Sequence, residues 1–217
     1  MQVRGAVAVG LMLAVSIGGC SRSGQKEVGV GVAKSALAIH PALIGSAVPP
    51  LTLYTPEGRQ QELRAVLAQK PTVLVVYKGN WCIYCLKQLA DLQKIEPDLL
   101  ALGYQIVGLS PDLPSELRKT VEKRQLNYTL LSDFQMQAAR ALGLAYYVDE
   151  ATRRELERRN VEFVGLSVQP GRMLPVPAVF IVDTRGIIRW QYVNPDYTER
   201  VPTGVLLAAA RCLAEKK

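Results

Sequence analysis

Histidine is nearly absent from this chain, whose 217 residues include a single one, His40. A structural zinc site takes four Cys or His ligands as a rule, and the sequence around His40 offers no others. Cysteine is also scarce, and four cysteines in a chain of this length are too few for a domain held together by disulfides. We therefore predict no metal site, no bound cofactor and no disulfide-rich scaffold.

Long hydrophobic runs are lacking as well. After about the first two dozen residues, nothing approaches the roughly 20 apolar residues that a membrane-spanning helix needs. Charged residues make up 21% and hydrophobic residues 49% of the chain, as in globular proteins rather than disordered ones. The net charge of +7 comes from basic residues that are spread out or alternate with glutamates, so no nucleic-acid partner is predicted. One globular domain is the expectation.

Residues 1–19 have the pattern of a secretory signal. Arg4 gives a positive start, residues 6–17 are small or apolar, and two glycines precede Cys20. The end of this pattern resembles the bacterial lipobox, whose cysteine is lipid-modified and becomes the mature N-terminus. The resemblance implies an exported protein that is anchored to the bacterial membrane through Cys20, and Ser21 at the next position favours the outer membrane. An ordinary signal with an incidental cysteine is the alternative.

The remainder of the chain is divided into a tether and one domain. Residues 20–48 are rich in Gly, Ala, Val and Ser and are predicted to connect the lipid anchor to a domain over residues 49–217. Strands are predicted at 51–54, 72–77, 104–109, 128–131, 178–183 and 187–192, and helices at 60–68, 82–99, 115–125, 134–142, 149–160 and 202–215. This order predicts an α/β fold with a central mixed β-sheet flanked by helices, and residues 149–174 form an insertion.

Two cysteines, Cys82 and Cys85, lie where a buried strand leads into a long amphipathic helix. A thiol at a helix N-terminus is favoured as thiolate by the free N–H groups and the helix dipole. We therefore expect Cys82 to attack and Cys85, one turn further, to resolve the product. A structural disulfide is the alternative, but a bridge that closes so short a loop restricts little of the unfolded chain.

Residues 49–192 resemble the alkyl hydroperoxide reductase/thiol-specific antioxidant (AhpC/TSA, peroxiredoxin-like) branch of the thioredoxin superfamily. Residues 75–85, which contain the CxxC, and residues 174–183 carry the likeness. The resemblance implies a thioredoxin-like fold and an antioxidant oxidoreductase, whose partner is a hydroperoxide or a thiol/disulfide protein. It also implies that the Val176–Pro177 peptide bond is cis and faces the redox-active cysteines.

The chain departs from that family pattern before Cys82. Peroxiredoxins usually have threonine or serine three residues before the attacking cysteine, and here that residue is Gly79. They also have a proline further upstream, and in this chain Val75 stands at its position. The departures leave two activities open, hydroperoxide reduction and exchange with protein disulfides. A peroxidase also needs a cation near the attacking cysteine. The candidates are Lys78, Arg140, Arg185 and Arg189, and a solvated Lys78 is the alternative to a role for that residue.

Three further positions carry weaker signals. Trp81 and Tyr84 flank the cysteines and are candidates for a rim that contacts the partner, or for core residues. Cys212, in the last predicted helix, is expected to be a buried single thiol. A non-catalytic thioredoxin-fold protein, such as a copper chaperone, is a third possible function, but those relatives need a histidine after their cysteines and none follows His40. The oligomeric state is left open.

Overall fold

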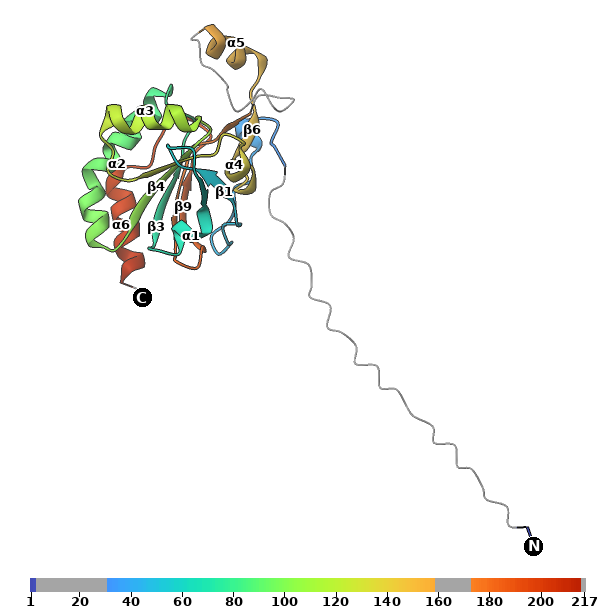
Figure 1. Ribbon diagram of the computed structural model, residues 1–217. Coiled ribbons are helices and arrows are strands. Elements are labelled where there is room, and N and C mark those ends of the chain that lie inside the picture. The colour runs from blue at the N-terminus through green and yellow to red at the C-terminus, as the bar shows by residue number, and fades with distance from the viewer. Residues whose placement is uncertain (3–30, 159–172, 216–217) are drawn as a thin grey trace.

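The computed structural model describes residues 1–2, 31–158 and 173–215, so the predicted signal sequence and lipobox lie outside the described residues. A seven-stranded sheet with the order β2-β1-β5-β4-β3-β8-β9 forms the centre of the fold (Figure 1). Its strands are β1 (Thr52–Tyr54), β2 (Gln60–Glu62), β3 (Thr72–Val76), β4 (Gln105–Ser110), β5 (Thr129–Ser132), β8 (Ala178–Val182) and β9 (Ile188–Val193). The helices are η1 (Ala36–Ala38), α1 (Leu63–Leu67), α2 (Ile83–Ala101), α3 (Pro114–Arg124), α4 (Gln137–Ala141), α5 (Glu150–Arg158) and α6 (Thr203–Ala214).

Strand β3 lies in the middle of the sheet and positions the site. It pairs in parallel with β4 and antiparallel with β8, and all five of its residues are buried. Its side chains alternate between two cores. Val73 and Val75 pack with residues of α2, α3 and α6 on one face, and Leu74 and Val76 pack with residues of α1 and α4 on the other. The mixed sheet with helices on both faces is the predicted architecture.

The predicted helix over residues 60–68 is only partly correct. Residues 60–62 form strand β2, which pairs antiparallel with β1, and α1 begins only at Leu63. The turn between the two strands contains Gly58, whose φ of 81° lies in the left-handed region that glycine tolerates best. Residues 60–62 therefore pair with β1 across this hairpin and are not part of the helix that the periodicity predicted.

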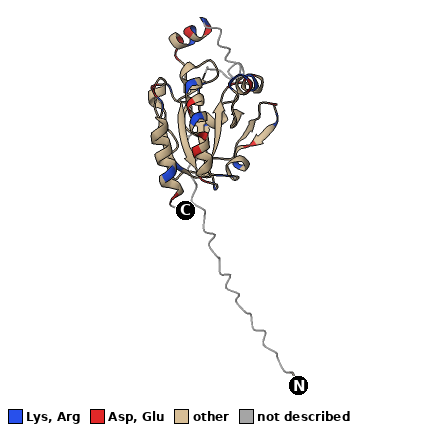
Figure 2. Ribbon diagram, turned by 90° about the vertical axis from the view of Figure 1, so that its left-hand side faces the viewer, with Lys and Arg blue, Asp and Glu red and all other residues tan. Residues whose placement is uncertain are grey.

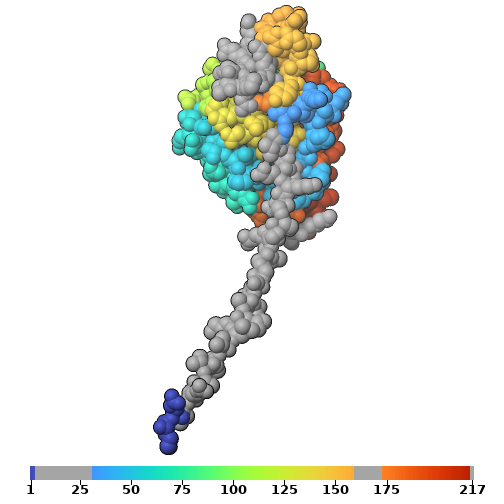
Figure 3. Space-filling model, turned by 90° about the vertical axis from the view of Figure 1, so that its right-hand side faces the viewer, coloured from blue at the N-terminus to red at the C-terminus, as the bar shows by residue number. Residues whose placement is uncertain are grey.

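Residues 31–48 differ from the expected tether, because they pack on the domain. Ala42 and Val48 are buried in the core beside α1 and α4. The amide of Ala42 donates to the carbonyl of Leu142, and that of Val48 donates to the carbonyl of Gly186. Figure 3 shows this segment in blue against the surface of the domain. The described part of the domain thus begins well before residue 49.

The insertion is framed by a small second sheet. Strands β6 (Ala145–Tyr147) and β7 (Met173–Pro175) pair antiparallel, and α5 follows β6. The Asp149 carboxylate caps α5 by accepting from the amide of Thr152 at 2.8 Å. Residues 159–172, most of the predicted irregular stretch, lie outside the described residues.

Charged residues of both signs are interleaved on the surface rather than gathered into one patch of a single sign (Figure 2). On α5, for example, Arg153 pairs with Glu150 and Glu157. Among the described residues, no helix is both long and apolar enough to cross a bilayer.

Candidate active site

Cys82 is the N-cap of α2. Its backbone is extended, and its sulfur accepts a hydrogen bond from the amide of Cys85 at 3.4 Å. The helix therefore directs one of its unpaired N–H groups at the sulfur, as expected for a thiolate at this position. Cys82 is 3% exposed and Cys85 is fully buried one turn further along the helix. Both are free thiols in the structure.

The two thiols have opposite pKa shifts. The pKa of Cys82 is lowered to about 6, first by the Cys85 thiol, which donates a hydrogen bond to its sulfur, then by the Cys85 amide and by the charges of Arg200 and Lys78, against the effect of burial. The pKa of Cys85 is raised, chiefly by burial and then by the neighbouring Cys82. At neutral pH, Cys82 is the thiolate and Cys85 the thiol, which are the states that the attacking and resolving roles require.

Arg200 is the cation beside the cysteines, and sequence reasoning missed it. It lies between β9 and α6, and its Nη2 contacts the Cys85 sulfur at 3.4 Å. Its other terminal nitrogen, Nη1, donates to the carbonyls of Tyr197 and Glu199, which fixes the guanidinium in place. No motif marks this residue, because it reaches Cys85 from a loop 115 residues further along the chain.

The three arginines proposed from the sequence are elsewhere. Arg185 and Arg189 both pair with Asp183, in the turn and strand that follow β8. Arg140 lies in α4, where its charge acts on Asp133. The error arises because the sequence does not show which arginine the fold brings close to the cysteines.

Lys78 is buried rather than solvated, with 4% of its surface exposed. Its amino group lies over the ring of Tyr197 at 4.1 Å from the centroid and 5.8 Å from that of Tyr146. Electron-rich ring faces hold a cation that has lost much of its water. Burial lowers the pKa of Lys78, and the neighbouring Cys82 acts in the opposite direction. Of its candidate cations, the sequence thus located one correctly, but neither tyrosine was recognised.

Gly79 occupies a position where no side chain fits. Its φ is +138°, and a Cβ there would lie 2.8 Å from Trp81 Nε1 and 2.9 Å from Asp112 Oδ1. The Asp112 carboxylate is fixed by the amide of Asn80 at 3.0 and 3.2 Å and by the hydroxyl of Ser110 at 2.8 Å. The threonine or serine of the family pattern is therefore excluded by the neighbours of Gly79.

The expectation of a cis bond before Pro177 is wrong. No peptide bond within the described ranges is cis, and this one is among them. The amide of Val176 donates to the carbonyl of Leu144, so the chain passes in extended form from β7 to β8, and the trans isomer is the one favoured by default. Val176 packs in a cluster with Trp81, and Ala178 pairs with Val76 at the end of β3.

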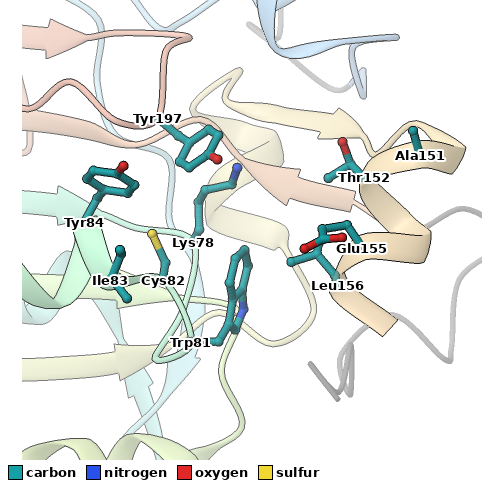
Figure 4. A pocket seen from close by; sticks show the side chains of 10 residues that line it. All are labelled: Lys78, Trp81, Cys82, Ile83, Tyr84, Ala151, Thr152, Glu155, Leu156 and Tyr197. Atoms are coloured by element: carbon teal, nitrogen blue, oxygen red, sulfur yellow. The ribbon is translucent and has the colours of Figure 1, made fainter. Parts of the chain in front are cut away.

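A cavity of about 550 Å³ opens at Cys82 (Figure 4). Its lining residues are Lys78, Trp81, Cys82, Ile83, Tyr84, Ala151, Thr152, Glu155, Leu156 and Tyr197. Tyr84 is 37% exposed and meets Tyr197 edge to face, with 5.8 Å between the ring centroids. Trp81 and Tyr84 are thus wall residues of the cavity, and α5 of the insertion forms the opposite side.

Cys212 is exposed, contrary to the expected buried thiol. The buried positions of α6 are Leu206 and Ala210. Two residues after Ala210, a side chain has turned by about 200° around the helix and faces away from the core. The position of the helix was predicted correctly, but the burial of Cys212 was not.

Comparison with known proteins agrees with this geometry. Residues 44–191 match the AhpC/TSA family. A putative peroxiredoxin bcp from Haemophilus influenzae is 30% identical over 106 residues, which are 49% of this chain and 68% of the relative. Two solved structures, a peroxidoxin BcpB from Mycobacterium tuberculosis and a reduced Prx3 in complex with H2O2 from Vibrio vulnificus, superpose with TM-scores of 0.61 and 0.63. They are 21% and 20% identical, over 78% of this chain in both cases and over 97% and 99% of their own chains.

These solved relatives have the thioredoxin-like α/β fold that the resemblance implied, and this chain shares it. The family match covers more than half of the chain and spans the CxxC, the cavity wall formed by α5 and the β8–β9 hairpin. The chain belongs to the AhpC/TSA family and is an oxidoreductase of thiols and disulfides.

Proposed function

We propose that this oxidoreductase is a dithiol peroxidase, in which Cys82 reduces a hydroperoxide and Cys85 resolves the oxidised sulfur. The observation that carries the proposal is the Cys82 sulfur at the α2 N-terminus, with a lowered pKa and direct access to the cavity. The name of the Haemophilus influenzae relative, a putative peroxiredoxin, supports the same chemistry.

The reaction has two steps. The Cys82 thiolate attacks the terminal oxygen of the hydroperoxide, the O–O bond breaks and the departing oxygen takes up a proton, so that the products are Cys82 sulfenic acid and an alcohol or water. Cys85 then attacks the Cys82 sulfur, and its proton leaves with the hydroxyl as water, which gives the Cys82–Cys85 disulfide. A dithiol partner protein restores both thiols by disulfide exchange. In this scheme, Trp81 and Tyr84 shape the entrance, and Val176 packs beside Trp81, with Pro177 next to it in the chain.

The direct test is rapid-mixing oxidation of the reduced protein by hydrogen peroxide and by an alkyl hydroperoxide, followed through tryptophan fluorescence. We expect one equivalent of oxidant to remove two thiols, with the exposed Cys212 still reactive toward a thiol reagent afterwards. Since the thiolate reacts, the rate should fall about tenfold per pH unit below a pKa of about 6 and level off above it. A rate no greater than that of a free thiol at every pH would contradict the proposal.

Exchange with protein disulfides is the second candidate function. Two observations favour it: Gly79 leaves no room for the hydroxyl of the family pattern, and Ile83, between the cysteines, is 71% exposed and available to a partner. The same oxidation experiment separates the two activities. A slow reaction with hydroperoxides together with fast reduction of a protein disulfide would assign the chain to this second function.

We also propose that the protein is exported and anchored to a bacterial membrane, the outer one in a Gram-negative host, through lipid on Cys20. Support comes from the sequence alone, in which an apolar run and two glycines precede Cys20. In a bacterial host, the wild type is expected to incorporate labelled fatty acid and to sediment with membranes. Cys20→Ala should lose the label, and Cys212→Ala, the matched control, should keep it. Equal labelling of both variants would contradict lipidation at Cys20.

A further inference from the structure

The Lys78 amino group has an environment different from that of the other cation at the site. It lies against two ring faces, and within the described ranges no carboxylate pairs with it. In Figure 4, its side chain passes between Cys82 and Trp81, and its nitrogen ends beside Tyr197. Lys78 thus lines the same cavity as the reacting sulfur.

Arg200, by contrast, is in direct contact with Cys85, although its charge also lowers the pKa of Cys82. Its guanidinium contacts the Cys85 sulfur and two backbone carbonyls. It lines a separate cavity of about 500 Å³, which shares Tyr84 with the first cavity but does not include Cys82. A guanidinium also remains protonated throughout the usual pH range and cannot act as an acid. Of the two cations, only Lys78 has both a place beside Cys82 and a proton that it can release.

We propose that Lys78 is the catalytic acid of the peroxide step, which donates a proton to the oxygen that leaves. The proposal rests on the peroxidase function proposed above. As the Cys82 sulfur bonds to the terminal oxygen of an organic hydroperoxide, the O–O bond breaks and the electron pair goes to the departing oxygen. That oxygen takes a proton from the Lys78 ammonium and leaves as the alcohol. Cys82 is oxidised to the sulfenic acid, the hydroperoxide is reduced, and the neutral amine regains its proton from solvent.

The surroundings of Lys78 suit this role. The rings of Tyr146 and Tyr197 hold the nitrogen in one place at little cost in conformational freedom. Burial lowers the pKa of Lys78, which makes its ammonium a stronger acid than that of an exposed lysine. In the family pattern, the hydroxyl of a threonine or serine donates a hydrogen bond to the peroxide. Gly79 has no hydroxyl, and the Lys78 ammonium supplies a hydrogen-bond donor in its place.

The test compares two oxidants, because only one of them needs the proton. An alkyl hydroperoxide releases an alkoxide, which is strongly basic, whereas a peracid releases a carboxylate, which is stable without a proton. For Lys78→Met, we expect the rate with the alkyl hydroperoxide to fall about 100-fold further than the rate with the peracid. The matched control is Lys87→Met, on the exposed surface of α2, which should react with both oxidants as the wild type does.

A residue that only stabilised the thiolate would affect both oxidants alike, so an equal loss in Lys78→Met would overturn the proposal. A second measurement needs no variant. In the wild type, the alkyl hydroperoxide rate should decline at alkaline pH, as Lys78 loses its proton. A peracid itself ionises at mildly alkaline pH, so its rate is expressed per protonated peracid, and on that basis it should stay level. Parallel profiles would contradict the role. Failure of the peroxidase function itself is distinguishable, because the wild type would then react with neither oxidant faster than a free thiol.

Discussion

Cys82→Ser is expected to abolish rapid oxidation by hydroperoxides, with a loss on the order of a thousandfold, or about 4 kcal/mol of transition-state stabilisation. The reason is that the only thiolate facing the cavity in the described structure is removed. A serine hydroxyl at the same place stays protonated at neutral pH and is a poor nucleophile. Rapid mixing of the reduced variant with an alkyl hydroperoxide measures the effect.

Cys85→Ser separates the two roles. We expect the first step to remain fast in this variant, although the pKa of Cys82 should rise because the thiol that donates a hydrogen bond to its sulfur is replaced. Oxidation should stop at the sulfenic acid, which a dimedone-type reagent traps and mass spectrometry detects. Cys212→Ser is the control and should behave as the wild type, since its thiol is exposed on α6 away from the core. If Cys85→Ser were inactive in the first step and Cys82→Ser were active, the assigned roles would be reversed.

Gly79→Thr, which restores the residue of the family pattern, is expected to destabilise the protein instead of improving catalysis. A side chain at φ +138° is strained, and its Cβ would meet Trp81 and the fixed carboxylate of Asp112 below 3 Å. Backbone strain and overpacking each cost about 1–3 kcal/mol, so the free energy of unfolding should fall by about 2–6 kcal/mol. Urea unfolding of the reduced protein measures the change.

Gly58→Ala is the matched control for this prediction. Gly58 also has a positive φ, 81°, but an added Cβ meets nothing within 4 Å. This variant therefore reports strain without crowding and should lose only about 1 kcal/mol. A Gly79→Thr protein as stable as the wild type, with faster peroxide reduction, would show that the crowding around Gly79 relaxes and that the family pattern is compatible with this site.

Local patterns in the sequence correctly predicted the elements whose structure depends on residues close together in the chain. The apolar run at 72–77 became the buried strand β3, and the helical period after Cys82 became α2 with Cys82 at its cap. The redox pair that we propose was inferred from that junction and from the CxxC spacing. The pairing of Gln60–Glu62 with β1 was not visible, because it depends on a hairpin partner rather than on periodicity.

The groups that surround the pair come from distant parts of the chain and could not be predicted. Arg200 and Tyr197 belong to the loop before α6, and Tyr146 belongs to β6, yet all three contact the cysteines or Lys78. Their positions depend on the strand order of the main sheet, in which β8 lies between β3 and β9, and on the pairing of β6 with β7, and spacing along the sequence shows neither. The exposure of Cys212 likewise depends on which face of α6 meets the core.

The packing of residues 32–48 on the domain limits the reach of the tether that the proposed lipid on Cys20 would give. If Cys20 carries the lipid, a tether over all of 20–48 would let the domain sit about 100 Å from the bilayer at roughly 3.5 Å per residue. Because Ala33, Ala42 and Val48 are held on the domain, only the stretch from Cys20 to about Val32 separates it from the lipid. That stretch spans at most about 40 Å in any conformation. The domain, with its cavity at Cys82, would then work within about 40 Å of the lipid anchor.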